Sequence, residues 1–358
     1  MTINKDFWYG RTVLITGHTG FKGGWLALWL HKLGANVIGI SLEPASNPNL
    51  FNLARIYDCL ESNYCDIRDS KRINELVRAS KPEIVFHLAA QPLVRLSYRN
   101  PIDTYSTNIM GTVHVLDALR EISSVKVAVV VTTDKVYSNN DNSHPYRESD
   151  ILGGYDPYSA SKAACEVLIA SYRDAFLQKQ GVAIASARAG NVIGGGDWSE
   201  DRLIPDAIRA WQANQTLEIR QPFAIRPWQH VLEPLHGYLK LAEKLWFQPL
   251  LAGAYNFGPL TYEVNTVKET VEMARKAFGK AEVCYRESSD GPYESKWLAL
   301  ETFKAGQILD VYPRWKLPET ISRTINWYKA QNSGADASKL CLDDIACYEN
   351  SNDGRLYL

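Results

Sequence analysis

The residues best suited to chemistry lie in the stretch VTTDKVY at 131–137, where an apolar run ends in two threonines, an aspartate and a lysine. Thr133 offers a hydroxyl, Asp134 a carboxyl group and Lys135 an amine, all of which exchange protons or hydrogen bonds. Ligands of open α/β sheets bind beyond the carboxyl ends of the strands, so we expect these side chains in a substrate crevice. The competing interpretation is a surface ion pair of small energetic value.

A second reactive pair is Tyr158 and Lys162 in YSASK at 158–162. Side chains four positions apart share one face of a helix. A nearby ammonium favours the phenolate, so we expect a lowered pKa for Tyr158 and a role as the base that accepts a proton from a hydroxyl. Alone, Y-x-x-x-K often marks an exposed helical pair. Its place downstream of the threonine, aspartate and lysine favours the functional interpretation.

The third feature is a glycine triplet in TGHTGFKGGWL, with Gly17, Gly20 and Gly23 between an apolar strand and an amphipathic helix. Glycines there let the backbone approach a pyrophosphate, and the helix N-terminus offers free N–H groups. A glycine-rich turn without a ligand is the alternative. The strand before the triplet and the helix after it favour a phosphate cradle.

These residues need a scaffold, which recurring strand-length apolar runs supply. The runs are TVLIT at 12–16, NVIGIS at 36–41, EIVFHLAA at 83–90, VKVAVVVTT at 125–133 and VAIASARAG at 182–190. Near-continuous apolar strands separated by helices indicate a doubly wound, Rossmann-type parallel α/β sheet. We predict a dinucleotide-binding domain over 1–190, a smaller substrate-binding lobe over 191–330 with some exchange of chain between the two, and a polar tail over 331–358.

The composition limits the possible partners. Lys and Arg number 39 against 40 Asp and Glu, so no charge excess favours a nucleic acid or an anionic membrane surface. The six cysteines form no metal-type spacing and suit reduced thiols, and we predict no metal. The N-terminus lacks the apolar core of a signal peptide. We expect a cytoplasmic protein with a small-molecule substrate.

Several motifs together resemble the extended short-chain dehydrogenase/reductase family. They are HLAAQP at 87–92, TNIMGTVHVLDA at 107–118, YSASK at 158–162, NVIGGG at 191–196 and YNFG at 255–258. The resemblance covers nearly everything up to residue 330. It implies NAD as the cofactor, with Lys162 holding the nicotinamide ribose, and a homodimer that pairs two helices from each subunit. The helix at about 105–120 and the helix of Tyr158 are the candidates, and a higher oligomer stays open.

The resemblance also implies the cofactor-binding residues. They are Gly17, Thr19, Gly20, Phe21, Gly23, Ser41, Asp66, Ile67, Ala89, Ala90, Tyr158 and Lys162. Ser41 stands where a carboxylate commonly holds the adenosine ribose, and Glu43 comes two residues late. We therefore expect NAD to bind more loosely than is usual.

Within the family, a threonine followed by aspartate and a base resembles the nucleotide-sugar 4,6-dehydratases. Lysine as that base resembles those that act on CDP-D-glucose. The implied reaction oxidises sugar C4 with Tyr158 as base, eliminates water across C5 and C6, and returns the hydride to C6. Lys135, if unprotonated, is the expected base for the C5 proton, and Asp134, if its pKa is raised, the acid. Which of the two plays which role stays open.

The resemblance places five residues on the substrate: Asn191, Arg202, Leu203, Arg226 and Asn256. Guanidinium groups suit nucleotide phosphates because their planar fork pairs with phosphate oxygens. His230 is interpreted as a structural hydrogen-bonding residue. The alternatives are another nucleotide-sugar 4,6-dehydratase, a 4-epimerase that needs neither Asp134 nor Lys135, and a dinucleotide-binding protein without catalysis.

Overall fold

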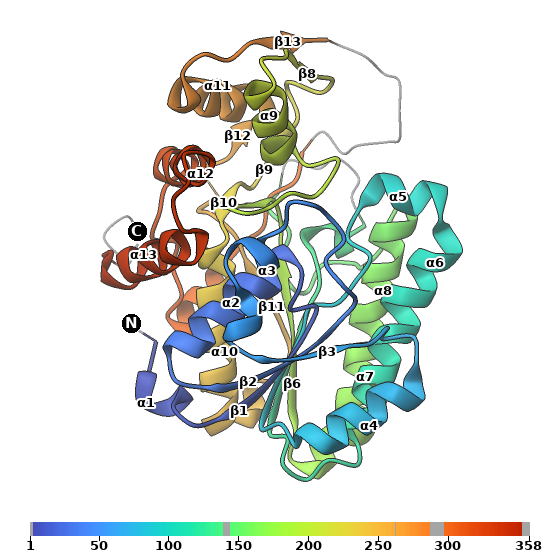
Figure 1. The fold of residues 1–358 in the computed structure, drawn as a ribbon. Coiled ribbons are helices and arrows are strands. Elements are labelled where there is room, and N and C mark those ends of the chain that lie inside the picture. Colours follow the sequence, from blue (N-terminus) through green and yellow to red (C-terminus); the bar gives the residue numbers. More distant parts are fainter. Residues whose placement is uncertain (1–2, 139–143, 262, 287–296, 353–358) are drawn as a thin grey trace.

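A seven-stranded parallel sheet forms the centre of the molecule (Figure 1). The computed structural model describes residues 3–138, 144–261, 263–286 and 297–352. The strand order is β11-β6-β5-β4-β1-β2-β3. The bounds are β1 Thr12–Thr16, β2 Asn36–Ser41, β3 Glu61–Tyr64, β4 Ile84–His87, β5 Val127–Val131, β6 Ala183–Ala189 and β11 Ala254–Phe257. The order reverses between β1 and β4, where doubly wound sheets open a ligand crevice. The predicted fold class is confirmed.

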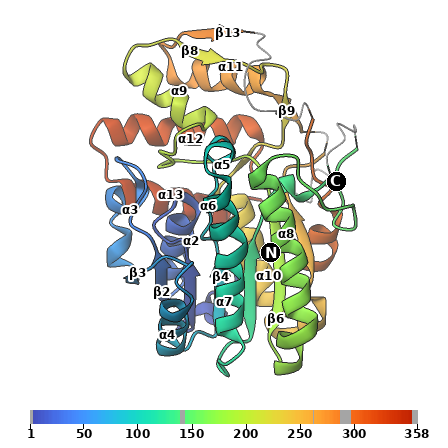
Figure 2. The same ribbon diagram turned by 90° about the vertical axis from the view of Figure 1, so that its right-hand side faces the viewer.

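Two hydrophobic cores lie on opposite faces of this sheet. Along β5, Val127, Val129 and Val131 belong to one core, and Ala128 and Val130 to the other, as expected when side chains alternate across a strand. Helices α2 and α10 cover the first face, and α4, α7 and α8 cover the second (Figures 1 and 2). Because both faces are covered, the strands are apolar on both sides, which explains their near-continuous apolar sequences.

The helices are mostly short. Their bounds are α1 Lys5–Trp8, α2 Phe21–Lys32, α3 Leu50–Leu53, α4 Ser70–Ser80, α5 Val94–Arg99, α6 Pro101–Tyr105, α7 Gly111–Leu119, α8 Pro157–Tyr172, α9 Leu203–Gln212, α10 Leu232–Phe247, α11 Val267–Phe278, α12 Leu317–Asn332 and α13 Ala337–Asn350. None of the helices in the described part of the chain has the length and apolar character needed to cross a membrane.

A smaller lobe stands above the carboxyl ends of the strands (Figure 1). Besides α9, α11 and α12 it contains short strands paired two by two: β8 Leu217–Ile219 with β13 Val283–Tyr285, and β9 Ile225–Arg226 with β12 Asn265–Thr266. A further pair, β7 Val192–Ile193 with β10 Gln229–His230, leads from β6 towards α10. Helix α10 and strand β11 return to the main sheet, so the chain crosses between the lobes after residue 190.

The prediction of a polar tail after residue 330 is wrong. Helix α13 packs on the first core, where Cys341, Ile345 and Tyr348 are fully buried. Its end is fastened to α2, because Trp29 Nε1 donates to Glu349 Oε1 at 2.8 Å and Lys32 pairs with the same carboxylate. Helix α13 therefore belongs to the folded body and supports the outer face of α2.

Replacing Ile345 by Ala should therefore destabilise the whole protein. Truncating a buried isoleucine costs about 2–5 kcal/mol of unfolding free energy, and Ile345 is completely buried. The matched control is Asp343→Ala on the exposed face of the same helix. Urea unfolding followed by circular dichroism measures both. Equal stabilities of the two variants would mean that α13 is not part of the cooperative unit.

Candidate active site

Thr133, Asp134 and Lys135 lie together at the carboxyl end of β5. Thr133 Oγ1 donates to Asp134 Oδ1 at 2.9 Å and accepts a hydrogen bond from the Lys135 amide. Asp134 is 2 % exposed, and its Oδ2 has no hydrogen-bond partner among the described residues. A Cβ at Gly190, just after β6, would lie 2.0 Å from that oxygen. The absence of a side chain at residue 190 thus leaves room for this buried carboxylate oxygen.

Lys135 projects from this strand end into a pocket between the lobes. Burial lowers the pKa of its amine, with the Arg226 and Arg202 charges acting in the same direction and Asp134 opposing them. A lysine with a lowered pKa is a better proton acceptor near neutral pH. The direction fits the expected role of Lys135 as a base.

Tyr158 and Lys162 lie on one face of α8, near Thr133. Asp156 caps the helix, accepting from the Ser159 amide at 2.9 Å. Burial raises the pKa of Tyr158 to about 12, while a hydrogen bond with the Thr133 side chain acts in the lowering direction. The expected lowered pKa is wrong in this structure, because burial outweighs the hydrogen bond with Thr133 and the charge of Arg202. Lys162 Nζ instead donates to the Val131 carbonyl at 3.3 Å.

One buried carboxylate fixes the helix of Tyr158 against the strands. Glu166, one turn after Lys162, accepts hydrogen bonds from Thr132 Oγ1 at 2.5 Å and Ser186 Oγ at 2.6 Å. It also pairs with Arg188 at 2.8 Å, and both side chains of this pair are 4 % exposed. The carboxylate therefore joins α8 to the carboxyl ends of β5 and β6.

The glycine triplet forms a tight turn between β1 and α2. Gly17 has a φ of +82°, and a Cβ there would lie 2.7 Å from the Ala89 amide nitrogen. A Cβ at Gly23 would lie 2.1 Å from the Gly17 carbonyl oxygen. Gly20 precedes α2 without a side-chain cap, so the first N–H groups of the helix are open to an anion. The turn fits the pyrophosphate of a dinucleotide, and Phe21 is the first residue of the helix that follows.

The other predicted cofactor residues surround the ends of β2, β3 and β4. Ser41 Oγ and Thr19 Oγ1 are hydrogen-bonded at 2.7 Å, so a pair of hydroxyls stands at the end of β2, where dinucleotide-binding folds commonly have a carboxylate. Asp66 accepts from the Arg68 amide, and Ile67 is buried behind it. Ala89 and Ala90 follow β4, beside the glycine turn. The positions suit an extended dinucleotide along the strand ends.

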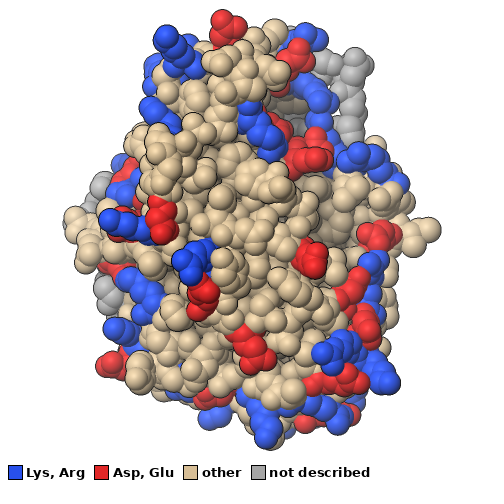
Figure 3. All heavy atoms as spheres, in the orientation of Figure 1, with Lys and Arg blue, Asp and Glu red and all other residues tan. Residues whose placement is uncertain are grey.

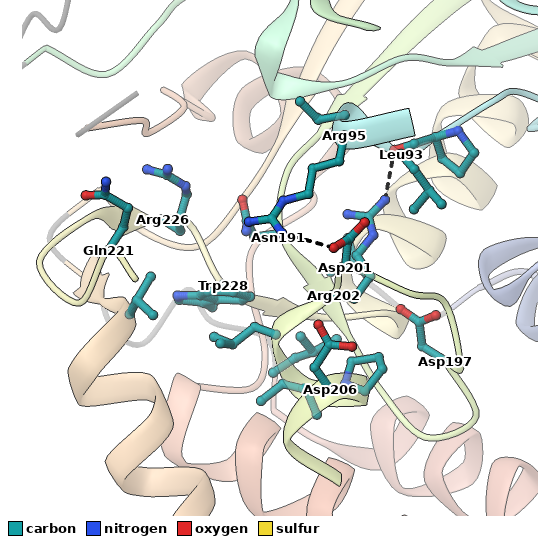
Figure 4. A pocket seen from close by; sticks show the side chains of 18 of the residues that line it. Leu93, Arg95, Asn191, Asp197, Asp201, Arg202, Asp206, Gln221, Arg226 and Trp228 are labelled. Carbon is teal, nitrogen blue, oxygen red and sulfur yellow. Dashed lines mark hydrogen bonds and ion pairs between the residues drawn. The ribbon is translucent and has the colours of Figure 1, made fainter. Parts of the chain in front are cut away.

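A pocket of about 300 Å³ opens between this edge of the sheet and the smaller lobe. Its lining includes Lys135 and four of the five predicted substrate residues: Asn191, Arg202, Leu203 and Arg226. Figure 4 shows Asn191, Arg202 and Arg226 around one space, with Trp228 below them. In Figure 3, charged side chains of both signs are interspersed on the face of the molecule that is drawn.

Asn256 does not belong to this pocket, and the prediction of a substrate role is corrected. Its Nδ2 donates to the carbonyls of Tyr146 and Glu301, and its Oδ1 accepts from the Tyr137 hydroxyl at 2.6 Å. The side chain is completely buried. The side-chain amide of Asn256 therefore connects the end of β11 to the segments that contain Tyr146 and Glu301. His230 is also buried, and its Nδ1 accepts from the Leu232 amide, as expected of a structural residue.

Two cations in the site were missed from the sequence. Arg95 at the start of α5 lines the pocket and lies beside Asn191 in Figure 4. Lys22 lies in the first turn of α2, and burial, followed by the charge of Arg202, lowers its pKa to about 8. Arg95 comes just after HLAAQP, and Lys22 lies within the glycine turn. Their closeness in sequence to these motifs was the signal that could have identified them.

Comparisons with known proteins agree with this geometry. Residues 14–324 match the family model described as GDP-mannose 4,6 dehydratase. The chain is 46% identical to a CDP-glucose 4,6-dehydratase of Salmonella typhimurium, over 97% of this chain and 98% of that protein. It is 27% identical to the dTDP-D-glucose 4,6-dehydratase of Homo sapiens over 90% and 91% of the two chains. An epimerase structure from Methanothermobacter thermautotrophicus superposes with a TM-score of 0.81 at 25% identity, covering 92% and 95%.

His87 at the end of β4 should make stability depend on pH. Its ring bridges Thr16 and Thr112, and burial lowers its pKa to about 3 from 6.5. The folded state keeps His87 neutral while the unfolded chain takes up a proton below pH 6.5, so stability falls as the pH falls. Lowering the pH to 5.5 should cost about 1.4 kcal/mol through this residue alone.

The measurement is urea unfolding at pH 7.5 and 5.5. His87→Asn should lose less stability on acidification than the wild type, by that amount. His31→Asn, at an exposed position, is the matched control. The same acid loss in His87→Asn and the wild type would contradict a neutral buried His87.

Proposed function

We propose that this chain, which belongs to the GDP-mannose 4,6 dehydratase family, is an NAD-dependent CDP-D-glucose 4,6-dehydratase. The product is CDP-4-keto-6-deoxy-D-glucose together with water, an early compound for deoxysugars of surface polysaccharide such as the O-antigen. The observation that carries the proposal is the convergence of Asp134 and Lys135 with Tyr158 beneath an arginine-lined pocket. The 46% identity to a CDP-glucose 4,6-dehydratase supports the choice of nucleotide.

In the proposed cofactor site, backbone N–H groups and hydroxyls bind NAD rather than charged side chains. The open N–H groups at the start of α2 suit the pyrophosphate, and Lys162 is assigned to the nicotinamide ribose. Ser41 and Thr19 offer hydroxyls to the adenosine ribose, which hold it less strongly than a carboxylate. When bound, NAD would supply a reversible hydride acceptor for the oxidation at C4 and the reduction at C6, and its cationic ring would favour the Tyr158 phenolate.

Side chains of this protein carry out the proton transfers. Tyr158, with Thr133 beside it, takes the proton of the C4 hydroxyl. The resulting ketone acidifies the C5 proton, which Lys135 removes, since its pKa is lowered by burial and by Arg226. Asp134, whose Oδ2 has no partner among the described residues, is assigned the role of acid toward the departing C6 hydroxyl. Lys135 then returns its proton to C5 when the hydride is delivered to C6. An epimerase needs only the first of these steps.

The main experiment incubates the protein with CDP-D-glucose and NAD and follows the alkali-induced absorbance of a 4-keto-6-deoxy sugar, with dTDP- and UDP-glucose in parallel. Lys135→Met should lower turnover about 10²- to 10⁴-fold, the usual loss when a proton-transfer group is removed. Lys71→Met, at an exposed site on α4, is the control. Since a base must be unprotonated, the wild-type rate should rise with pH through the lowered pKa of Lys135.

Other outcomes would change the proposal. Product from a different nucleotide would replace the substrate and keep the mechanism. Epimerised sugar without a 4-keto product would contradict the elimination. Absence of any reaction would favour the non-catalytic interpretation.

The enzyme is further proposed to be a homodimer. Ile102 on α6 is 83% exposed and Val167 on α8 is 61% exposed, and α6 packs beside α8. Tyr105, the last residue of α6, and Met110, directly before α7, are also exposed. Figure 2 shows α7 and α8 side by side with no element over them. Two such surfaces joined by a twofold axis would form a four-helix interface. The cytoplasmic location expected from the sequence stays a prediction.

The double variant Ile102→Asp/Val167→Asp should convert the dimer to a monomer, because a pair of buried charges on each side opposes an apolar interface. Light scattering coupled to size exclusion measures the mass, and circular dichroism checks the fold. Leu250→Asp, at a residue 88% exposed outside these helices, is the control. A wild-type protein of monomer mass would contradict the proposed dimer.

A further inference from the structure

Arg95 joins the two lobes across the mouth of the pocket. It lies in the first turn of α5, and its Nη1 donates to Asp201 Oδ1 at 3.2 Å. Asp201 belongs to the loop before α9, which carries a second contact across the same gap, from Arg202 Nη2 to the Pro92 carbonyl at 3.1 Å. The segments at 92–95 and 201–202 thus meet over the space that Lys135 enters from below.

The Arg95–Asp201 ion pair contributes little to stability. The two side chains are 31% and 29% exposed, and Arg95 Nη1 lies 3.2 Å from Asp201 Oδ1. Partly exposed pairs of this kind stabilise a protein by only about 0–1 kcal/mol. A stronger acceptor that enters the pocket can therefore compete with Asp201 for the guanidinium.

A diphosphate is such an acceptor. It is doubly charged and offers oxygens at a spacing that a guanidinium fork binds through two parallel hydrogen bonds. In Figure 4 the Arg95 guanidinium lies beside Asn191 and points toward Asp201, with Arg226 on one side of it and Arg202 on the other. A diphosphate held by Arg202 and Arg226 would thus lie within the ring of side chains that Arg95 completes.

We propose that Arg95 is a substrate-binding residue that leaves Asp201 for the diphosphate of the sugar nucleotide, so that Asp201 and the substrate compete for one guanidinium. This rests on the proposed function for the identity of the nucleotide. The exchange makes the contact between the lobes depend on the substrate: the carboxylate occupies Arg95 in the free enzyme, and the diphosphate replaces it in the complex.

The test compares Arg95→Gln, Asp201→Asn and the control Arg99→Gln, which removes an exposed positive charge on the same helix. Titration calorimetry with CDP and with cytidine gives the affinities, and steady-state kinetics with CDP-D-glucose gives KM and kcat. Arg95→Gln should weaken CDP about tenfold or more, the value of a hydrogen bond between charged groups, and raise KM more than it lowers kcat. Asp201→Asn should tighten CDP about two- to fivefold by removing the competitor. Cytidine affinity should change in neither variant.

Three results would overturn the proposal: CDP affinity in Arg95→Gln equal to that in Arg99→Gln, an equal loss for cytidine and CDP, or weaker CDP binding in Asp201→Asn. Failure of the wild type to bind CDP would overturn it as well. A wild type that binds CDP but forms no 4-keto sugar would reject the proposed function alone, since the binding comparisons would still report on Arg95.

Discussion

The buried carboxylate of Glu166 is the interaction on which the arrangement of the site depends. It binds Thr132 and Ser186 on two neighbouring strands and the guanidinium of Arg188. Removing one partner of a buried ion pair costs about 3–5 kcal/mol, because the other charge is left in a medium of low dielectric. Helix α8 therefore has one register against β5 and β6. Since Tyr158 and Lys162 lie on that helix and Thr133 and Asp134 follow β5, this register sets the distances among all four.

The two halves of the proposed ligand site offer phosphate groups different kinds of hydrogen-bond donor. On the dinucleotide side, the N-terminus of α2 and the glycine turn present backbone N–H groups, which need close approach and no charge. On the sugar-nucleotide side, Arg202 at the N-cap of α9 and Arg226 in β9 line the pocket, and their guanidinium groups supply the positive charge. Charge on that side has a second effect, because it also lowers the pKa of Lys135.

The sequence was sufficient for the sheet and for the positions of the reactive residues, because apolar runs and glycine spacing are local signals. It failed where an outcome depended on distant packing. The segment of α13 carries its buried residues, Cys341, Ile345 and Tyr348, at helical spacing. So few apolar residues do not predict a helix that packs on the core, unless the helix against which they pack is already known. The pKa of Tyr158 was misjudged because the charge of Lys162 is visible in the sequence and the burial of the phenol is not. Arg95 was not singled out from the sequence, since only the fold brings it opposite Asp201.

The contact between Glu349 on α13 and Trp29 on α2 bears on how the chain folds during synthesis. These residues are 320 positions apart, so the outer face of α2 stays uncovered until nearly the whole chain is made. Strand β11 and helix α10, which complete the sheet and one of its faces, are also synthesised late. Contacts of such long range form slowly. The glycine turn and α2 are therefore among the first segments to be translated and among the last to gain all their packing contacts. A fragment ending near residue 190 would expose α2, which is rich in tryptophan and leucine, to solvent.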